Sequence, residues 1–217
     1  PIVRDTINIP TLNSYTRPDG IFVIQLYSFS ESSFALFGNA IQEFAKSGGD
    51  KLILDLRGNP GGYLEAAVDM ASWFLPAGKV VVTERPKDPK GERVYRSKGY
   101  GVAGPNLHVM ILVNGGSASA SEILSGALRE QGVAKLVGEK TFGKGSVQEL
   151  VQLTPETSLK VTIARWFTPN GNSISENGLV PDYVVKMTEA DGKAGRDPQM
   201  EKAADVLKSY PTFTVNQ

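Results

Sequence analysis

The sequence predicts an α/β domain in which parallel strands are joined by right-handed crossovers. Short β-branched and aliphatic runs alternate with segments in which apolar residues recur every three or four positions. Twice, such a run is followed by a glycine-rich loop and then by a helical pattern. The 217 residues are 41% hydrophobic and 21% charged, a composition typical of globular proteins. A chain of this length buries about 70% of its unfolded surface, so it needs no disulfide or structural metal.

The first half of the chain contains one strand–helix–strand–loop–helix unit. Residues 21–27 follow a Pro-Asp-Gly turn signal and are rich in β-branched and aromatic side chains, which predicts a strand. Residues 33–45 form an amphipathic pattern that stops at a glycine pair, as a helix does. Residues 51–56 predict a second strand, 57–62 a glycine loop and 64–74 a second helix.

The middle of the chain repeats this pattern. Residues 80–84 and 94–96 predict strands on either side of a polar, exposed excursion. The apolar run 107–113 predicts a buried strand, which leads through the loop 114–117 into a helix over 118–131. A glycine loop between a strand and a helix therefore occurs a second time.

The last part of the chain mixes strands with one helix. Residues 133–138 predict a strand, and 141–145 form a loop punctuated by glycines. Residues 146–153 and 159–167 have the pattern of two paired antiparallel strands. A terminal helix is expected over 197–209, with an Asp-Pro pair as its cap and first turn.

The composition excludes several kinds of function. The chain has no cysteine, which removes a disulfide scaffold, a Cys-ligated zinc site and a thiol nucleophile. It has 23 basic and 23 acidic residues, so no net field attracts nucleic acid or anionic lipid. The longest apolar runs are far shorter than the ~18 residues of a membrane span. We therefore expect no nucleic-acid partner and no transmembrane segment.

The single histidine limits the possible catalytic chemistry. His108 lies in the apolar run 107–113, where a neutral imidazole at the end or on one face of a strand is the expected role. A Ser-His-Asp triad or a histidine-rich metal site is disfavoured. The glycine loops lack the spacing of phosphate-binding motifs, so we expect no cofactor and no metal.

The loop 114–117 carries serines into the first turn of the helix that follows it. Backbone N–H groups in a first turn have no intrahelical partner and suit a developing oxyanion. Ser117, Ser119 and Ser121 are therefore candidates for a nucleophile, although serines at this position are commonly helix caps. Lys144, between two glycines, is the remaining candidate base, and apolar surroundings could lower its pKa. From residue types and spacing alone, a solvated surface lysine is the more common case.

Three ordered motifs resemble those of the C-terminal processing peptidases, or tail-specific proteases. The motifs are DLRGNPGG at 55–62, NGGSASASEI at 114–123 and GEKTFGKGSVQ at 138–148, and segments 165–171 and 178–182 match as well. The resemblance covers roughly residues 4–209. It implies a layered β-sheet core flanked by helices, like that of crotonase and ClpP, with a small cap region built from the N-terminal segment and the C-terminal strands.

The resemblance also implies a role for each site residue. Ser119 corresponds to the nucleophile, Lys144 to its general base and Gln148 to the residue that orients the lysine. The implied oxyanion donors are backbone amides, those of Ala120 and of Gly61 or Gly62. Glu122 is left as a first-turn carboxylate that suits the helix dipole. The expected activity is that of a serine endopeptidase that cleaves proteins near their C-termini through a Ser-Lys dyad, in which no histidine is needed.

Members of this family usually carry a PDZ domain that binds substrate C-termini by strand addition. The resemblance implies that residues 1–20 are a segment following the position of that domain and that 21–217 are the protease core. The chain begins without an initiator Met or a signal-peptide pattern, so we expect part of a longer protein with a PDZ domain. The expected substrates are unfolded or C-terminally exposed proteins, a homo-oligomer is possible, and the expected location is the bacterial periplasm, the outer face of the cell membrane or, in plants, the thylakoid lumen.

Two alternatives stay open. The first is a catalytically silent or ligand-binding core of the same fold, as in the related domains of retinoid-binding proteins. The second is a crotonase-like acyl-CoA enzyme, which uses amide oxyanion holes but needs neither Ser119 nor Lys144. A serine, a lysine and a glutamine at the matching positions favour the protease.

Overall fold

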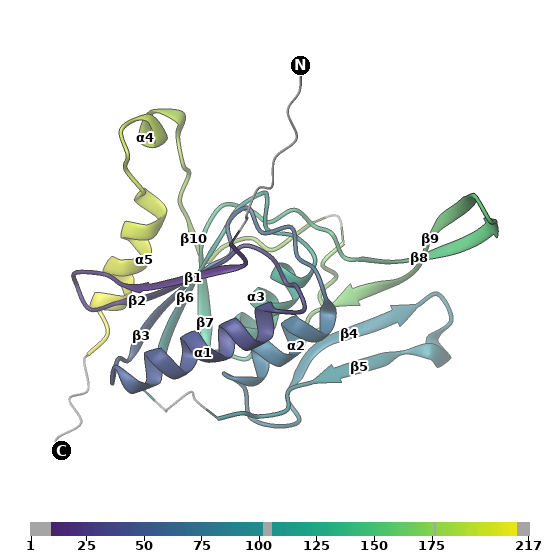
Figure 1. The fold of residues 1–217 in the computed structure, drawn as a ribbon, viewed down its shortest axis with the longest axis horizontal. Coiled ribbons are helices and arrows are strands. Elements are labelled where there is room, and N and C mark those ends of the chain that lie inside the picture. Colours follow the sequence, from purple (N-terminus) through teal and green to yellow (C-terminus); the bar gives the residue numbers. More distant parts are fainter. Residues whose placement is uncertain (1–9, 102–105, 176, 212–217) are drawn as a thin grey trace.

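The computed structural model describes residues 10–101, 106–175 and 177–211. A six-stranded main sheet lies at its centre (Figure 1). Its strands, in spatial order, are β1 (Leu12–Thr16), β2 (Phe22–Leu26), β3 (Lys51–Asp55), β6 (His108–Val113), β7 (Ala134–Gly138) and β10 (Tyr183–Val184). All neighbours pair in parallel except β1, which is antiparallel to β2. The sheet confirms the predicted parallel layout.

A second, antiparallel sheet stands beside the first. Its four strands lie in the order β5 (Arg93–Arg96), β4 (Val80–Pro86), β9 (Thr157–Phe167) and β8 (Ser146–Thr154), and a short 3-10 helix (Pro89–Gly91) lies between β4 and β5. The expected pairing of residues 146–153 with 159–167 is confirmed. In Figure 1 the β8–β9 hairpin projects away from the main sheet.

Helices cover both faces of the main sheet. The helices α1 (Ser33–Lys46), α2 (Leu64–Ser72) and α3 (Ala120–Glu130) lie on one side, and α5 (Pro198–Lys208) lies on the other, after the short α4 (Glu189–Lys193) (Figure 1). The sheet therefore has two core layers: the first lies between the sheet and α1, α2 and α3, and the second lies between the sheet and α5. Side chains alternate along each strand, so Leu52 and Leu54 belong to the first layer and Ile53 to the second. Burial on both faces explains why the central strands are continuous apolar runs.

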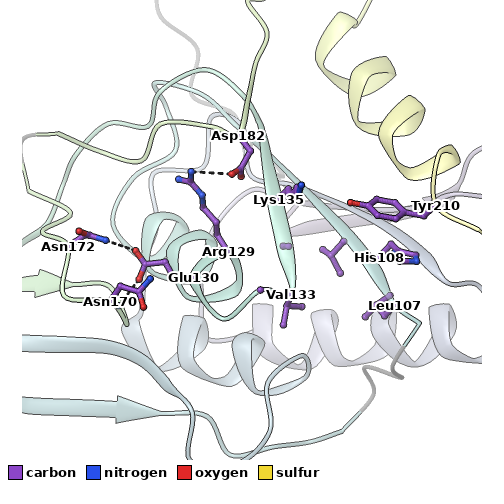
Figure 2. A pocket seen from close by; sticks show the side chains of 13 residues that line it. Leu107, His108, Arg129, Glu130, Val133, Lys135, Asn170, Asn172, Asp182 and Tyr210 are labelled. Atoms are coloured by element: carbon purple, nitrogen blue, oxygen red, sulfur yellow. Dashed lines mark hydrogen bonds and ion pairs between the residues drawn. The ribbon is translucent and has the colours of Figure 1, made fainter.

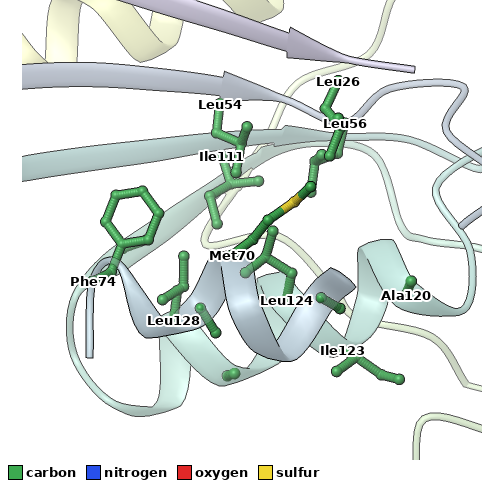
Figure 3. Packing of buried hydrophobic residues seen from close by; sticks show 14 of the residues in the cluster. Leu26, Leu54, Leu56, Met70, Phe74, Ile111, Ala120, Ile123, Leu124 and Leu128 are labelled. Atoms are coloured by element: carbon green, nitrogen blue, oxygen red, sulfur yellow. The ribbon is translucent and has the colours of Figure 1, made fainter. Parts of the chain in front are cut away.

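The first core layer holds the start of α3 in place. Figure 3 shows Met70 of α2 beside Leu124 of α3, with Ile111 of the sheet above them. Each of these three side chains is fully or almost fully buried. Dense packing of this kind leaves α3 little freedom to shift, so the loop before it is presented from a rigid base.

Besides the short 3-10 helix, three elements were not predicted, and one expectation differs from the structure. The strand β1, the two-residue β10 and the five-residue α4 lack a clear apolar pattern, since β1 is an edge strand without a buried residue and α4 buries none. The expected small cap region is instead the four-stranded second sheet, and the described part of the N-terminal segment joins the main sheet through β1. Such segments are positioned by backbone pairing at the edge of a sheet, and this pairing leaves no pattern in the local sequence.

Candidate active site

Ser119 stands at the head of α3, after the carboxyl end of β6. It is the N-cap residue of the helix, with φ +56° and ψ −114°. Among the residues that the structure describes, it is the one non-glycine residue with a positive φ. A side chain in this region costs about 1–3 kcal/mol and persists only where the surroundings enforce it. The strained backbone presents a half-buried serine at the first turn of a helix, where N–H groups are free.

The two glycine loops meet at this serine. The backbone oxygen of Asn59 accepts bonds from Ala118 N (3.0 Å) and from Ser121 Oγ (3.0 Å). Ser117 Oγ donates to Leu56 O at 2.7 Å. Ser117 and Ser121 thus join the two loops.

Glycine is required where the first loop approaches Ser119. A Cβ on Gly61, which has φ +97°, would lie 2.8 Å from Ser119 Cβ and 2.7 Å from Ala118 O. A Cβ on Gly62 would lie 2.2 Å from Phe29 O. No side chain fits at either position without moving backbone atoms.

The structure distinguishes the two glycine amides offered as oxyanion donors. Gly61 N–H donates to Asn59 Oδ1 at 2.9 Å and is already satisfied. Gly62 N–H has no hydrogen-bond acceptor in the described part of the chain. Ala120, the first residue of α3, also has a free N–H. Gly62 and Ala120 are therefore the amides available to a ligand oxygen.

The backbone of Lys144 reaches the head of α3, but among the described residues no hydrogen bond joins the Lys144 or Gln148 side chain to Ser119. Both side chains are exposed, and neither makes a hydrogen bond or ion pair with another described residue. Gln148 stands at a bulge in β8 opposite Thr162. The structure thus brings the lysine's loop to the head of α3 without joining the two catalytic candidates.

Glu122 fixes the loop of Lys144 to the head of α3. Its buried carboxylate accepts bonds from Ser119 N (2.9 Å) and Lys144 N (2.9 Å) on Oε2. Its Oε1 accepts from Gly143 N (2.7 Å) and Thr141 Oγ1 (2.5 Å). From the sequence, Glu122 was expected only to interact favourably with the helix dipole. The Ser-x-x-Glu spacing of a capping box was the available signal.

Arg57 is held by two carboxylates at the other end of the first loop. Asp55, at the end of β3, accepts from its Nε at 2.9 Å and from its Nη2 at 2.7 Å, and Asp197 accepts from Nη1 and Nη2 at 2.9 and 2.8 Å. Burial opposes the charged form of Arg57, but the bonds to both carboxylates outweigh it and raise the pKa of Arg57. Burial likewise opposes the charged Asp197, and its bond from Arg57 leaves the pKa of Asp197 lowered. This cluster was not foreseen from the sequence.

His108 lies at the far end of the sheet from Ser119. It opens β6, and its ring stacks on Tyr210 with centroids 4.1 Å apart. A six-residue strand spans about 20 Å, so the imidazole cannot reach the serine at the opposite end. The expected place at a strand end is confirmed.

A cavity of about 790 Å³ lies beside His108 (Figure 2). Its charged side chains are already engaged: Arg129 pairs with Asp182 at 3.2 Å, and Glu130 accepts from Asn172 Nδ2 at 2.9 Å. Among the described residues, no group of three or more histidine, aspartate or glutamate side chains could hold a metal ion. No helix in the described part of the chain is long and apolar enough to cross a membrane.

A serine at a strained helix head, free backbone amides beside it and a lysine on the adjoining loop are typical of serine hydrolases that work without histidine. The family model of peptidase family S41 matches residues 20–185. The chain belongs to this family.

Named relatives and solved structures agree. The chain is 37% identical over 188 residues to the carboxy-terminal processing protease CtpA of Bacillus subtilis and 38% identical over 196 residues to the carboxyl-terminal-processing protease of Synechocystis. These alignments cover 87% and 88% of the chain but only 40% and 45% of the two relatives. The structure of the photosystem II D1 C-terminal processing protease matches with a TM-score of 0.76 at 30% identity, covering 95% of this chain and 54% of that one. Mature CPAF, 16% identical with a TM-score of 0.66, shares the fold.

Proposed function

We propose that this chain is the peptidase core of a serine endopeptidase that cleaves polypeptides near their C-termini, with Ser119 as nucleophile, Lys144 as base and Gln148 as the residue that orients the lysine. The placement of Ser119 carries the proposal, because its strained backbone stands at the first turn of α3 where the loop with the free Gly62 amide approaches it. Membership of peptidase family S41 and the names of its C-terminal processing relatives support it.

The proposed reaction is acyl transfer. Neutral Lys144 Nζ takes the proton from Ser119 Oγ, which attacks the scissile carbonyl carbon. The carbonyl oxygen becomes an oxyanion bonded to the amides of Gly62 and Ala120. The lysine then gives its proton to the leaving amine, and water hydrolyses the acyl-enzyme. A positioned base contributes about 10²–10⁴ in rate and one oxyanion donor about 10²–10³.

In the proposed reaction the dyad forms by movement of the Lys144 side chain. Glu122 already bonds the backbone N–H groups of Ser119 and Lys144, so the two main-chain segments are fixed relative to each other. The lysine side chain has four rotatable bonds with which to turn toward the serine. Gln148, four positions further, then supplies a hydrogen-bond partner for its amine.

The chain spans less than half the length of the two curated relatives, so we propose the setting of the reaction by analogy. The substrates are unfolded or C-terminally exposed proteins, and a PDZ domain in the full-length protein selects them. The protein acts on the outer side of the bacterial cell membrane or in the periplasm, or in a thylakoid lumen, and forms homo-oligomers.

A catalytically silent core is the second candidate, because the Lys144 side chain is exposed and free of Ser119. Cleavage of casein separates the two. The proposal expects activity in the wild type, little in Ser119→Ala and Lys144→Ala, and little in Lys144→Arg, since arginine stays protonated. Lys140→Ala, which alters an exposed lysine of the same loop, is the matched control and should cleave normally. An inactive wild type supports the silent core, and equal activity in all variants overturns the dyad.

A further inference from the structure

The N-terminus of α5 contacts the loop that leads to the oxyanion glycine. All five N–H donors of Arg57 are used: three by the contacts of its Nη atoms with Asp197 and Gln199, and the others by Asp55. The bond from Arg57 Nη1 to Gln199 Oε1 is 3.1 Å long. Asp197 lies 140 positions from Arg57 in the sequence, so only the fold brings them together.

The loop from Arg57 to Gly62 is anchored at several points, of which two side chains, those of Asn59 and Arg57, belong to the loop itself. Asn59 holds its middle, with its Nδ2 donating to Leu26 O at 2.7 Å and its Oδ1 accepting from Gly61 N. Arg57 holds its beginning. Asp55 is already fixed in the sheet, so Asp197 is the carboxylate that holds Arg57 from a separate element.

Asp197 also caps α5, because its Oδ1 accepts from Met200 N at 2.9 Å. Its carboxylate therefore joins the positive end of a helix to a guanidinium. The helix itself is held by apolar packing of Ala203, Ala204 and Leu207 against the main sheet. Loss of the Asp197 charge should loosen the loop without releasing the helix.

We infer that Asp197 is a positioning residue, which holds the Arg57–Gly62 loop so that the Gly62 amide meets the oxyanion. This inference rests on the proposed function and deepens it. A small displacement of a catalytic group lowers the rate steeply, by as much as about 10² for 1 Å. The oxyanion develops in the transition state and is carried by the tetrahedral intermediate but is absent from the bound substrate, so the effect falls on kcat rather than KM.

The test is Asp197→Asn, which preserves shape and can still cap α5. We expect kcat on a short peptide substrate to fall about tenfold, with KM unchanged. A peptide boronate forms an adduct with Ser119 that carries an oxyanion-like oxygen, so the affinity for the boronate should fall by the same factor. Asp205→Asn, on an exposed position of the same helix, is the control and should match the wild type in both. Unchanged kcat and boronate affinity in a folded Asp197→Asn protein overturn the inference.

Hydrogen exchange provides a readout that needs no activity. The hydrogen-bonded backbone amides of Gly58, Asn59, Gly61 and Tyr63 should exchange faster in Asp197→Asn, while those of β3 and of α5 beyond its first turn stay protected. Equal exchange of these four amides in the two proteins overturns the inference even if the wild type cleaves nothing. An inactive wild type combined with faster loop exchange refutes the proposed function and leaves the coupling of α5 to the loop intact.

Discussion

Replacement of Glu122 by glutamine is expected to detach the Lys144 loop from the head of α3. The glutamate accepts four hydrogen bonds, two on each carboxylate oxygen, and its side chain is completely buried. Glutamine keeps one acceptor oxygen and replaces the other with an NH₂ group. That group would face two donors instead of accepting from them, so at least two bonds are lost.

The magnitude follows from the kind of bond. A hydrogen bond to a charged group contributes about 1.5–3 kcal/mol, so two lost bonds lower the free energy of unfolding by about 3–6 kcal/mol. For a chain of this size, each kcal/mol shifts Tm by about 2–4 °C. We therefore expect Tm to fall by roughly 6–24 °C. Because the bonds fix Ser119 relative to Lys144, kcat should fall by about 10².

Thermal unfolding by circular dichroism and initial rates on a peptide substrate measure the two effects. Glu130→Gln is the matched control, since Glu130 ends the same helix and accepts from Thr168 Oγ1, Asn170 N and Asn172 Nδ2. It should lower Tm while leaving kcat unchanged. A Glu122→Gln protein with Tm within about 2 °C of the wild type and an unchanged kcat would refute the reasoning.

Two further predictions concern the first loop and the surface. Gly61→Ala should lower kcat by at least about 10², because the new methyl would lie 2.8 Å from Ser119 Cβ, whereas Gly115→Ala, which meets no atom within 4 Å, should be active in the same peptide assay. Asp19→Asn should lose about 1 kcal/mol in urea unfolding at pH 7, because the bond from Arg17 lowers the pKa of Asp19. The pKa of Asp19 is lower in the folded protein than the unfolded value of about 3.9. The ionised carboxylate therefore stabilises the fold above that pH, and this contribution is lost as the pH falls below it. The difference in unfolding free energy between Asp19→Asn and the wild type should then vanish in acid. A difference that persists at low pH contradicts this cause.

Much of the fold could be predicted because most of its strands and helices have distinct local sequence patterns. The apolar runs, the helical periodicity and the glycine stops placed the strands β2, β3, β6 and β7 and the long helices within a few residues. The strand β1, by contrast, has an exposed pattern and depends on pairing with β2. Pairing is a long-range property, which a single segment does not encode.

The candidate site divides in the same way. Residue types and spacing offered Ser117, Ser119 and Ser121 as nucleophiles and Lys144 as a base, and the lone histidine disfavoured a triad, because chemical capacity belongs to the residue itself. Only the resemblance to the C-terminal processing peptidases singled out Ser119 among the three serines. The choice of Gly62 over Gly61 depends on a bond from Gly61 to Asn59, which only the folded loop reveals.

The sequence by itself determined the order of strands and helices, the glycine loops and the residues able to do chemistry. Tertiary structure alone decided the partners: Glu122 with the loop of Lys144, and Arg57 with Asp197, 140 positions away. Local patterns arise from interactions within a turn or a strand. The stability of a buried charge depends on hydrogen-bond donors and opposite charges, and these come from distant segments once the chain has folded.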